Sequence, residues 1–429
     1  MSGTPRLSVV MPMRNAGHCV CQMLDSLATQ RIFMQIVVVD DASEDDSVAR
    51  VAAWSRQSGQ PVELVRNTRQ LYSYGSRLKG LARATAPVVW CVDADDRIPP
   101  NADVSAALTI MERERPDILH CKACGVLPGS SLQKPLIWTE PVAERLRGKD
   151  IFAAFLAHAY PPGTLCNKFF SARLVKAVLA AAPDLEIRYF DVKFLGLLFL
   201  LYAESYTACN ELIYEYRMRA HRPAWLYARQ VDALLLLEQT LDQTVKEGAP
   251  DQLEAFRAYC KRRLIIQSGH LSLMAEAELK PLRAKQADPH DWLAQNVLAN
   301  ISQKELLHAL CRSLAANSAR LCGWAEDIGR LYGVSDLLPH DPAWPALDSL
   351  LVTTQEWLCG DFGAKTCRRL AQCGIHLGRG LADADFCHFV STAKNSDRLL
   401  LALLLANAQL ARAITAVMAP DIDITKKAN

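Results

Sequence analysis

The sequence predicts an α/β protein with a mostly parallel sheet in its N-terminal half, followed by an all-helical domain. Two observations lead to this fold class. Up to about residue 122, short runs rich in β-branched residues alternate with segments of helical periodicity, as expected of parallel strands joined by crossover helices. From about residue 220 onward, the strand runs stop and long Leu- and Ala-rich segments with helical spacing replace them.

Five buried strands are expected in the first part of the chain, each a short and mainly apolar run. They cover residues 7–11, 35–40, 62–65, 88–92 and 117–121. The helical segments between them cover residues 18–29, 75–84 and 102–114, with another that begins at Ser47. Strands connected in this way form a sheet whose two faces are both covered by helices.

The change of pattern predicts two domains, one of residues 1–220 and one of residues 221–429. A chain of 429 residues also exceeds the size of one ordinary hydrophobic core. In the second domain, Leu234–Leu237 with Leu241 and Val245 form one apolar stripe of an amphipathic helix. Prolines predict a further break within the helical domain near residues 336–345.

The overall charge excludes one class of partner. The chain has 48 basic and 46 acidic residues and a net charge of +2, so there is no electrostatic basis for binding nucleic acid. Its 14 cysteines are scattered, and several lie inside apolar runs, as reduced core thiols do. No signal peptide is recognisable, and the longest uncharged apolar stretches fall short of the ~20 residues of a spanning helix. We therefore expect a cytoplasmic protein, with the inner face of the membrane as an alternative location.

Polar side chains follow three of the predicted strands, where ligands of open parallel sheets bind. Pro12, Arg14 and Asn15 follow the first strand, the run 40–45 ends the second, and the run 93–96 follows the fourth. Each cluster has an alternative interpretation, because Asp and Ser after a strand often cap the next helix. Capping is as good an explanation as binding for Asp45 and Ser47, but a poorer one for the acidic run 93–96.

The acidic run predicts a metal site. Asp93, Asp95 and Asp96 place three carboxylates within four residues, and their repulsion is relieved by a cation or by solvent. Hard oxygen ligands on a short turn suit Mg²⁺ or Mn²⁺, which keep coordination positions for phosphate oxygens. The first strand is not followed by the glycine-rich motif of dinucleotide dehydrogenases, and the chain has no P-loop. A metal ion that holds a nucleoside diphosphate is the interpretation that remains.

Three segments together resemble the family 2 glycosyltransferases. They are residues 7–15 (LSVVMPMRN), 38–47 (VVDDASEDDS) and 92–96 (VDADD), in the order and at the separations usual in that family. The resemblance implies a GT-A fold, with a Rossmann-like sheet, and a metal-dependent, inverting glycosyltransferase of the hexosyltransferase type. Such an enzyme moves a sugar from a nucleotide-sugar donor, here expected to be UDP-linked, to an acceptor hydroxyl.

The same resemblance assigns donor-binding roles to individual residues. Pro12, Arg14 and Asn15 match the turn that lines the base pocket, where a planar guanidinium can stack on the base. Asp41 matches the aspartate that accepts a hydrogen bond from the imide N–H of the base. Arg77 matches an arginine that faces the donor phosphates, although the Asn that follows it in the family is Leu78 in this chain.

The metal ligands and the base are assigned in the same way. Asp93 matches a residue near the ribose and the metal, Asp95 matches the main ligand of Mn²⁺ or Mg²⁺, and Asp96 is expected to support it. Residues 165–169, 188–194 and 213–219 resemble segments of the bacterial polysaccharide branch, in which Asp191 matches the general base. The acid that precedes this base in the family is Phe190 here, and Glu186 is the nearest other acid. Asp191 also has an alternative interpretation as a helix-capping or surface residue.

Two other functions remain as alternatives. A sugar-nucleotidyltransferase would carry a glycine-rich basic loop after the first strand, which this chain lacks. A catalytically degenerate module that binds a nucleotide-sugar or glycan would explain Phe190 and Leu78, but the acidic run 93–96 argues against it. The expected acceptor is a glycan or a lipid-linked sugar in surface-polysaccharide or glycoconjugate assembly. The helical domain could serve self-association or peripheral membrane contact.

Overall fold

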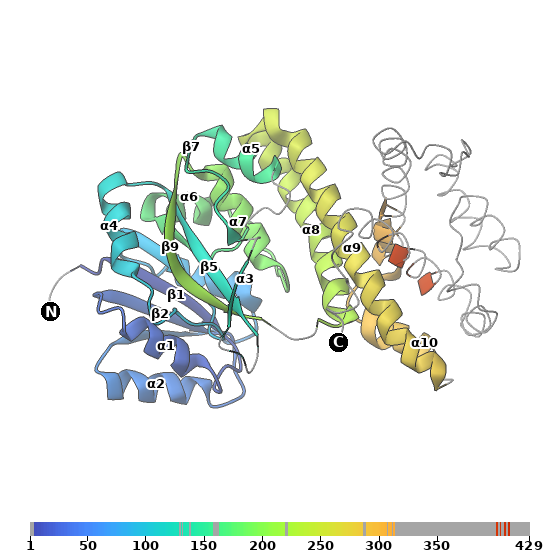
Figure 1. Ribbon diagram of the computed structural model, residues 1–429, viewed down its shortest axis with the longest axis horizontal. Helices are drawn as coiled ribbons and strands as arrows, with labels where there is room; N and C mark the ends of the chain where they lie inside the picture. Colours follow the sequence, from blue (N-terminus) through green and yellow to red (C-terminus); the bar gives the residue numbers. More distant parts are fainter. Residues whose placement is uncertain are drawn as a thin grey trace, which may run out of the picture. The chain divides into compact units, whose positions relative to one another are not determined.

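The computed structural model describes residues 4–127, 130, 132–136, 139–157, 163–218, 222–285 and 289–306, with isolated positions beyond (308–310, 312, 313, 400, 401, 404, 407, 408 and 411) (Figure 1). The break expected near residues 336–345 lies outside this part of the chain. Contacts between residues divide the chain into two units. One consists of Met1–Ala220 with Leu237–Tyr259, and the other of His221–Leu236 with Cys260–Asn429. The first unit thus includes a stretch of helix that lies beyond residue 220, where the sequence analysis placed the domain boundary.

Nine strands of the described residues form one sheet in the first unit (Figure 1). They are β1 (Leu7–Met13), β2 (Met34–Asp40), β3 (Val62–Arg66), β4 (Val88–Cys91), β5 (Ile118–Val126), β6 (Gln133–Pro135), β7 (Arg145–Arg147), β8 (Lys168–Ser171) and β9 (Ser205–Arg217). The order across the sheet is β3-β2-β1-β4-β8-β5-β9-β7, and β6 pairs with β5. The predicted α/β fold with a mostly parallel sheet is confirmed.

Strands β1 to β4 are parallel neighbours and correspond to the first four predicted strands. β1 lies in the middle, with Val9 opposite both Ile36 of β2 and Trp90 of β4. All residues of β1 and β4 are buried, because helices cover both faces of this part of the sheet. The carboxyl ends of these four strands therefore lie along the same edge.

The strand between β4 and β5 was not expected. β8 runs antiparallel to both of its neighbours and follows β5 by more than forty residues along the chain. The indole Nε1 of Trp90 donates a 2.6 Å hydrogen bond to the carbonyl of Cys166, just before β8, and the Trp90 ring packs against Phe169. No strand was predicted here, because Lys168–Ser171 is too short to show a period and has none of the β-branched residues that mark β4.

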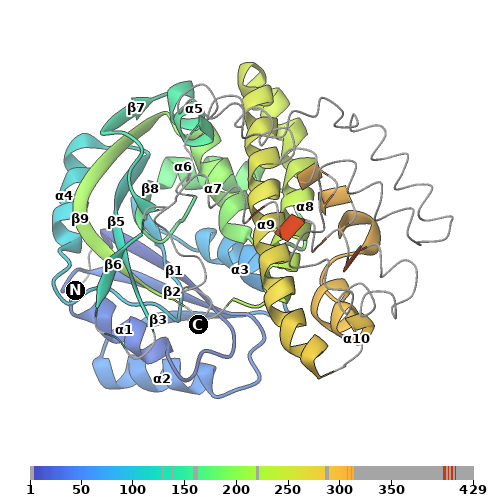
Figure 2. The same ribbon diagram turned by 45° about the vertical axis from the view of Figure 1, so that its right-hand side comes forward.

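The helices of the first unit cover both faces of the sheet (Figure 1 and Figure 2). They are α1 (Val20–Ala28), α2 (Ser47–Ser58), α3 (Tyr72–Leu81), α4 (Val104–Glu114), α5 (Lys149–Ala157), α6 (Ala172–Ala181) and α7 (Asp191–Tyr202). Apolar side chains of α1, α2 and α4 join one core with those of β1, β2 and β4. α3, α6 and α7 contact one another, with α3 against β1 and β2 and α6 against β4.

Helix α3 lies unusually close to the sheet at Gly80. A Cβ atom at this position would lie 2.4 Å from Val10 Cγ1 and 3.1 Å from Val39 Cγ2. Only glycine fits such an approach, because both neighbours are themselves buried in central strands. The close packing fixes the height of α3 above β1 and β2, and thereby the position of the side chains one turn earlier on the same helix.

The remaining described elements are helical, as the sequence predicted. They are α8 (Ala224–Gly248), the 3₁₀ turn η2 (Pro250–Gln252), α9 (Leu253–Ala284), α10 (Pro289–Leu293) and the π-helical turn η3 (Ala294–Leu298). Within the second unit, the carboxylate of Glu278 accepts hydrogen bonds from the backbone N–H of Ala224 and from the indole of Trp292. A search of the described helices finds none with the length and hydropathy needed to cross a membrane.

A polar cluster is buried inside the core of the first unit. Lys168 is 3% exposed, and its Nζ donates hydrogen bonds to the carbonyl of Thr164 (2.6 Å) and to Asn167 Oδ1 (3.2 Å). The amide of Asn167 in turn donates to the carbonyls of Cys121 and Thr139. These bonds join β5 to the start of β8, so the cluster holds the inserted antiparallel strand in place.

The buried amine makes the free energy of unfolding depend on pH. Burial lowers the pKa of Lys168 to about 7, from 10.5 in the unfolded chain. Between these two values the unfolded chain binds one more proton than the folded protein, so the free energy of unfolding rises with pH by up to ~1.4 kcal/mol per unit. Below pH 7 Lys168 is protonated in both states, so its contribution to the free energy of unfolding no longer changes with pH. We expect Lys168→Met to lose this slope in urea unfolding between about pH 7 and 9. If the unfolding free energies of the two proteins changed in parallel with pH, Lys168 would not be the group that causes the slope.

Candidate active site

The polar residues predicted from the strand ends do meet along one edge of the sheet. β1, β2, β3 and β4 are parallel and end at Met13, Asp40, Arg66 and Cys91. Pro12 is buried within β1, opposite Val39, and Arg14 and Asn15 follow directly. This is the edge at which ligands of open α/β sheets bind.

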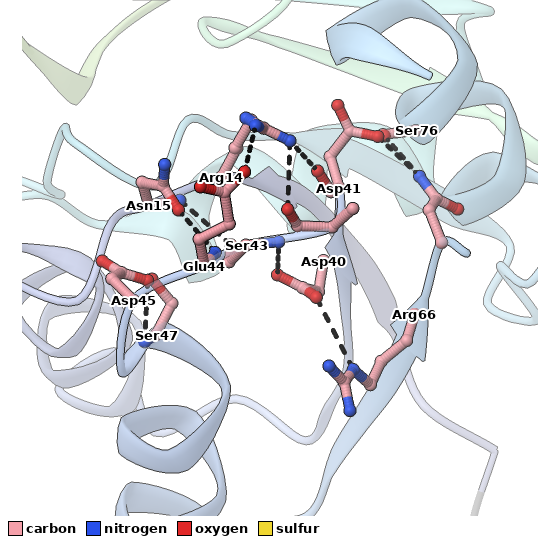
Figure 3. Close-up of polar contacts among 12 residues, drawn as sticks. Arg14, Asn15, Asp40, Asp41, Ser43, Glu44, Asp45, Ser47, Arg66 and Ser76 are labelled. Carbon is pink, nitrogen blue, oxygen red and sulfur yellow. Dashed lines mark hydrogen bonds and ion pairs between the residues drawn. The ribbon is translucent and has the colours of Figure 1, made fainter. Parts of the chain in front are cut away.

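The turns after β1 and β2 are tied together by side chains (Figure 3). Nη1 of Arg14 donates to the carbonyls of Asp41 (2.8 Å) and Ala42 (3.0 Å). Asn15 has a left-handed backbone (φ 47°) and exchanges hydrogen bonds with the second turn, from its N–H to Ser43 Oγ and from the Glu44 N–H to its Oδ1. Arg14 and Asn15 thus fix the shape of the turn that carries Asp41.

Asp45 and Ser47 bond to each other and to the turn after β1, while the N-cap position of α2 is taken by Asp46, whose side chain makes no capping hydrogen bond. Asp45 accepts hydrogen bonds from the backbone N–H of Ser47 and of Gly17 and from the Ser47 hydroxyl, and this last bond is the largest cause of its lowered pKa. Ser47 is buried, and its hydroxyl accepts from the N–H of Ala16. Both side chains therefore join the start of α2 to the turn after β1, and Figure 3 shows the contact between the two.

Asp41 is buried and held in one orientation. Its Oδ1 accepts hydrogen bonds from the side-chain amide of Asn67 (2.8 Å) and from the backbone N–H of Leu71 (2.7 Å). The same amide also donates to the hydroxyl of Ser76 on α3 (3.0 Å). A chain of contacts thus runs from the turn after β2, through the loop after β3, to the helix that carries Arg77.

Arg77 joins two of the predicted site residues. It is 3% exposed, and its Nη1 donates a 2.5 Å hydrogen bond to Asp191 Oδ2, while its Nη2 is paired with Asp93 Oδ1. Asp191 is the first residue of α7 and lies 114 positions from Arg77 in the sequence. Its predecessor Phe190 has a left-handed backbone (φ 62°), so the chain turns sharply just before the carboxylate.

The charges of this cluster oppose one another. Burial acts to lower the pKa of Arg77, but the carboxylates of Asp191 and Asp93 outweigh it and raise that pKa. Burial also raises the pKa of Asp191, which the positive charge of Arg77 partly offsets and the negative charge of Asp93 increases. Arg77 therefore stabilises the ionised form of Asp191, which is the form that can accept a proton.

Asp95 and Asp96 differ in their surroundings. Asp95 is exposed at the edge of the sheet. Asp96 is 1% exposed, and its two oxygens accept hydrogen bonds from the Tyr214 hydroxyl and the Arg217 backbone N–H, both at 2.8 Å. Burial and the nearby charges of Asp93 and Asp95 raise the pKa of Asp96. The predicted supporting role of Asp96 is compatible with this position, since its carboxylate anchors the acidic turn to β9.

The acidic turn offers a metal ion a small set of ligands. Within the described part of the chain, no group of three or more His, Cys, Asp or Glu side chains is arranged to hold a metal ion. Mg²⁺ and Mn²⁺ do not need one, because one or two carboxylates suffice when substrate phosphates and water complete the shell. Asp93 and Asp95, with hard oxygen donors at the ligand-binding edge, fit an ion of this kind.

Three residues that support the site were not singled out from the sequence. They are Asn67, which orients Asp41, Tyr214, which donates to Asp96, and Lys79, whose Nζ donates to Asn67 Oδ1 at 2.9 Å. Asn67 could have been found, because it directly follows β3 as the other clusters follow their strands. Tyr214 lies in the segment 213–219 that resembles the family, but that resemblance assigned it no role. Lys79 is an exposed lysine on a helix and carries no comparable signal.

Residues 8–165 match the model of Glycosyl transferase family 2, which confirms the resemblance stated from the sequence. Among curated proteins, the amylovoran biosynthesis glycosyltransferase AmsB of Erwinia amylovora is 32% identical over 152 residues, which are 33% of this chain and 50% of AmsB. The uncharacterized glycosyltransferase YaiP of Escherichia coli is 29% identical over 127 residues, 30% of each chain. The chain thus spans half or less of the length of these relatives.

Among solved structures, the fold is similar to that of S. aureus TarS 1–349. The TM-score is 0.50 at 18% sequence identity, and the match covers 72% of this chain and 88% of that one. At this identity the likeness bears on the fold alone. It agrees with the GT-A arrangement that the sequence predicted, a mostly parallel mixed sheet followed by helices.

Proposed function

We propose that this chain, whose residues 8–165 belong to glycosyl transferase family 2, transfers a sugar from a nucleotide-diphosphate donor to an acceptor hydroxyl with inversion of configuration. One observation carries the proposal beyond the family match. Arg77 contacts both Asp93, at the predicted metal turn, and Asp191, the predicted base, so the residues for donor and acceptor chemistry share one buried cation.

Asp93 and Asp95 are the residues that would hold Mg²⁺ or Mn²⁺ with the donor diphosphate. When bound, such an ion neutralises negative charge on the departing nucleoside diphosphate. Arg77 adds a second positive charge at the same place. Its Nε is buried without a hydrogen-bond partner among the described residues, so this donor group is still unsatisfied in the structure.

Asp191 is the proposed general base. It accepts the proton of the acceptor hydroxyl while that oxygen attacks the anomeric carbon from the face opposite the leaving group. The hydroxyl becomes acidic only as the new bond forms, so a carboxylate is a sufficient base. Arg77 opposes the effect of burial on the pKa of Asp191 and so favours the ionised carboxylate, whose orientation it also fixes. Glu186 is not needed, since its own carboxylate is paired with Arg188 on the surface.

Asp41 and Arg14 are proposed to receive the nucleobase. Asp41 is held in place next to the turn formed by Arg14 and Asn15, at the same edge of the sheet as Asp93. A carboxylate accepts from the imide N–H of uracil and has no such donor to meet in cytosine, which supports a UDP-linked over a CDP-linked donor. The similarity to a protein named for amylovoran biosynthesis supports an acceptor in surface-polysaccharide assembly.

The direct test is a panel of nucleotide-sugars with the full chain, a glycan acceptor and Mn²⁺, Mg²⁺ or EDTA. We expect turnover with a UDP-sugar that depends on the divalent ion, and we expect Asp95→Ala to lose metal-dependent binding of UDP in calorimetry. Glu112→Ala, which removes an exposed acid of α4 that pairs with Arg6, is the matched control and should keep metal-dependent binding. Binding of a UDP-sugar without turnover in the wild-type chain would favour the degenerate binding module instead.

A further inference from the structure

The side chain of Asn67 is fully used by three neighbours. It is 6% exposed and lies directly after β3. Its Nδ2 donates to Asp41 Oδ1 (2.8 Å) and to Ser76 Oγ (3.0 Å), and its Oδ1 accepts from Lys79 Nζ (2.9 Å). Every polar atom of this amide is therefore in a hydrogen bond within the first unit.

Lys79 determines which way the amide faces. An ammonium group can only donate hydrogen bonds, so the oxygen of Asn67 has to lie toward Lys79 and its NH₂ group toward Asp41. With the opposite orientation, two donors would face each other at Lys79 and two acceptors at Asp41. Lys79 is exposed, so its interaction with Asn67 can be removed without opening a cavity in the core.

The side-chain amide of Asn67 and the backbone N–H of Leu71 donate hydrogen bonds to the same oxygen of Asp41. Both bonds go to Oδ1, and none of the described residues donates a hydrogen bond to Oδ2. Two donors at fixed positions prevent the carboxylate from rotating about its last bond. Asp41 thus presents one defined acceptor, Oδ2, rather than two exchangeable ones.

We infer that Asn67 and Lys79 are positioning residues that set the nucleobase specificity of Asp41. This inference rests on the proposed function, in which Asp41 accepts from the imide N–H of the base. A fixed acceptor favours uracil, which has an N–H at N3, and rejects cytosine, which has a lone pair there. An acceptor that is free to rotate can turn away from the lone pair, so it discriminates less between the two bases.

The test compares the binding of UDP and CDP by calorimetry, in the presence of Mg²⁺. We expect the wild-type chain to prefer UDP by at least ~10-fold, since a site built to pair with an N–H strongly rejects the base that lacks it. Asn67→Leu is expected to reduce this ratio to within ~3-fold, because it removes one of the two donors that hold Asp41 Oδ1. Lys79→Met leaves this donor in place but no longer fixes the orientation of the amide, so it should reduce the ratio by a smaller factor. The ratio is informative, since general damage to the fold weakens both nucleotides alike.

Three further variants separate the possible outcomes. Lys176→Met removes an exposed lysine from α6 and should keep the wild-type ratio. Asp41→Asn should abolish the preference for UDP, and if it does not, the role of Asp41 in the proposed function is wrong. If Asp41→Asn loses the preference while Lys79→Met and Asn67→Leu retain it, the proposed function stands and the inference fails. Asn67→Asp should resemble Asn67→Leu, because two carboxylates then repel each other.

Discussion

Asp191→Asn is expected to reduce sugar transfer by ~10²- to 10⁴-fold, the usual contribution of a general base, and to leave UDP binding within ~3-fold of the wild-type value. The amide has nearly the shape of the carboxylate but cannot take up the proton of the acceptor. It can still contact Arg77 through its oxygen, so the donor-binding side of the site keeps its shape. Initial rates with saturating UDP-sugar and acceptor, together with calorimetry of UDP, measure the two quantities separately.

The matched control for this change is Glu186→Gln. Glu186 is the nearest other acid in the sequence, but it is half exposed and paired with Arg188 rather than with Arg77. Its amide variant should keep the wild-type rate. The opposite pattern, with transfer lost in Glu186→Gln and kept in Asp191→Asn, would move the role of base to Glu186 and leave Asp191 as a helix-capping residue.

Arg77→Met is expected to have the largest combined effect on activity and stability. The change leaves the carboxylates of Asp93 and Asp191 without their common cation, and loss of one partner of a buried ion pair typically costs ~3–5 kcal/mol of unfolding free energy. Transfer should fall below detection, because both the base and the charge facing the diphosphate are affected. Urea unfolding and rate measurements on the same preparation test both expectations.

Two other arginine variants serve as comparisons for Arg77→Met. Arg83→Met removes an exposed arginine that pairs with Glu63 on the surface, and it should change the unfolding free energy by less than ~1 kcal/mol. Arg77→Lys keeps the charge but can no longer contact both carboxylates in a planar fork. We therefore expect a free energy of unfolding between those of the wild-type protein and Arg77→Met, and strongly reduced transfer. Wild-type transfer in Arg77→Lys would show that charge alone, and not the bridging geometry, is what the site requires.

The sequence predicted those parts of the fold and site that depend on local pattern. The first four strands, their order along the chain and the polar residues at their ends follow from periodicity and from the rule for parallel sheets. What escaped prediction depends on contacts between distant segments. The antiparallel insertion of β8 is one case, and the pairing of Arg77 with Asp191 is another.

Asp96 illustrates why a motif alone does not assign a role to each of its members. In the sequence it is one of three acids in a short turn, and all three were expected at the metal. In the structure Asp96 is buried and accepts a hydrogen bond from the hydroxyl of Tyr214, whereas Asp95 is exposed. The difference arises from the path of β9. The resemblance of residues 213–219 to the last strand of the family's domain did not show that this strand passes the acidic turn and donates to Asp96.

The position of β8 and β9 has a consequence for how this chain relates to other proteins. The stretch that aligns with the family ends at residue 165, yet the sheet continues through β8 at Lys168–Ser171 and β9 at Ser205–Arg217. A truncated chain that stopped there would leave β4 and β5 with bare edges and Asp96 without its two donors. The matched stretch therefore contains only part of the sheet, and the two strands that flank β5, including the β9 residues that hold Asp96, come from sequence beyond it.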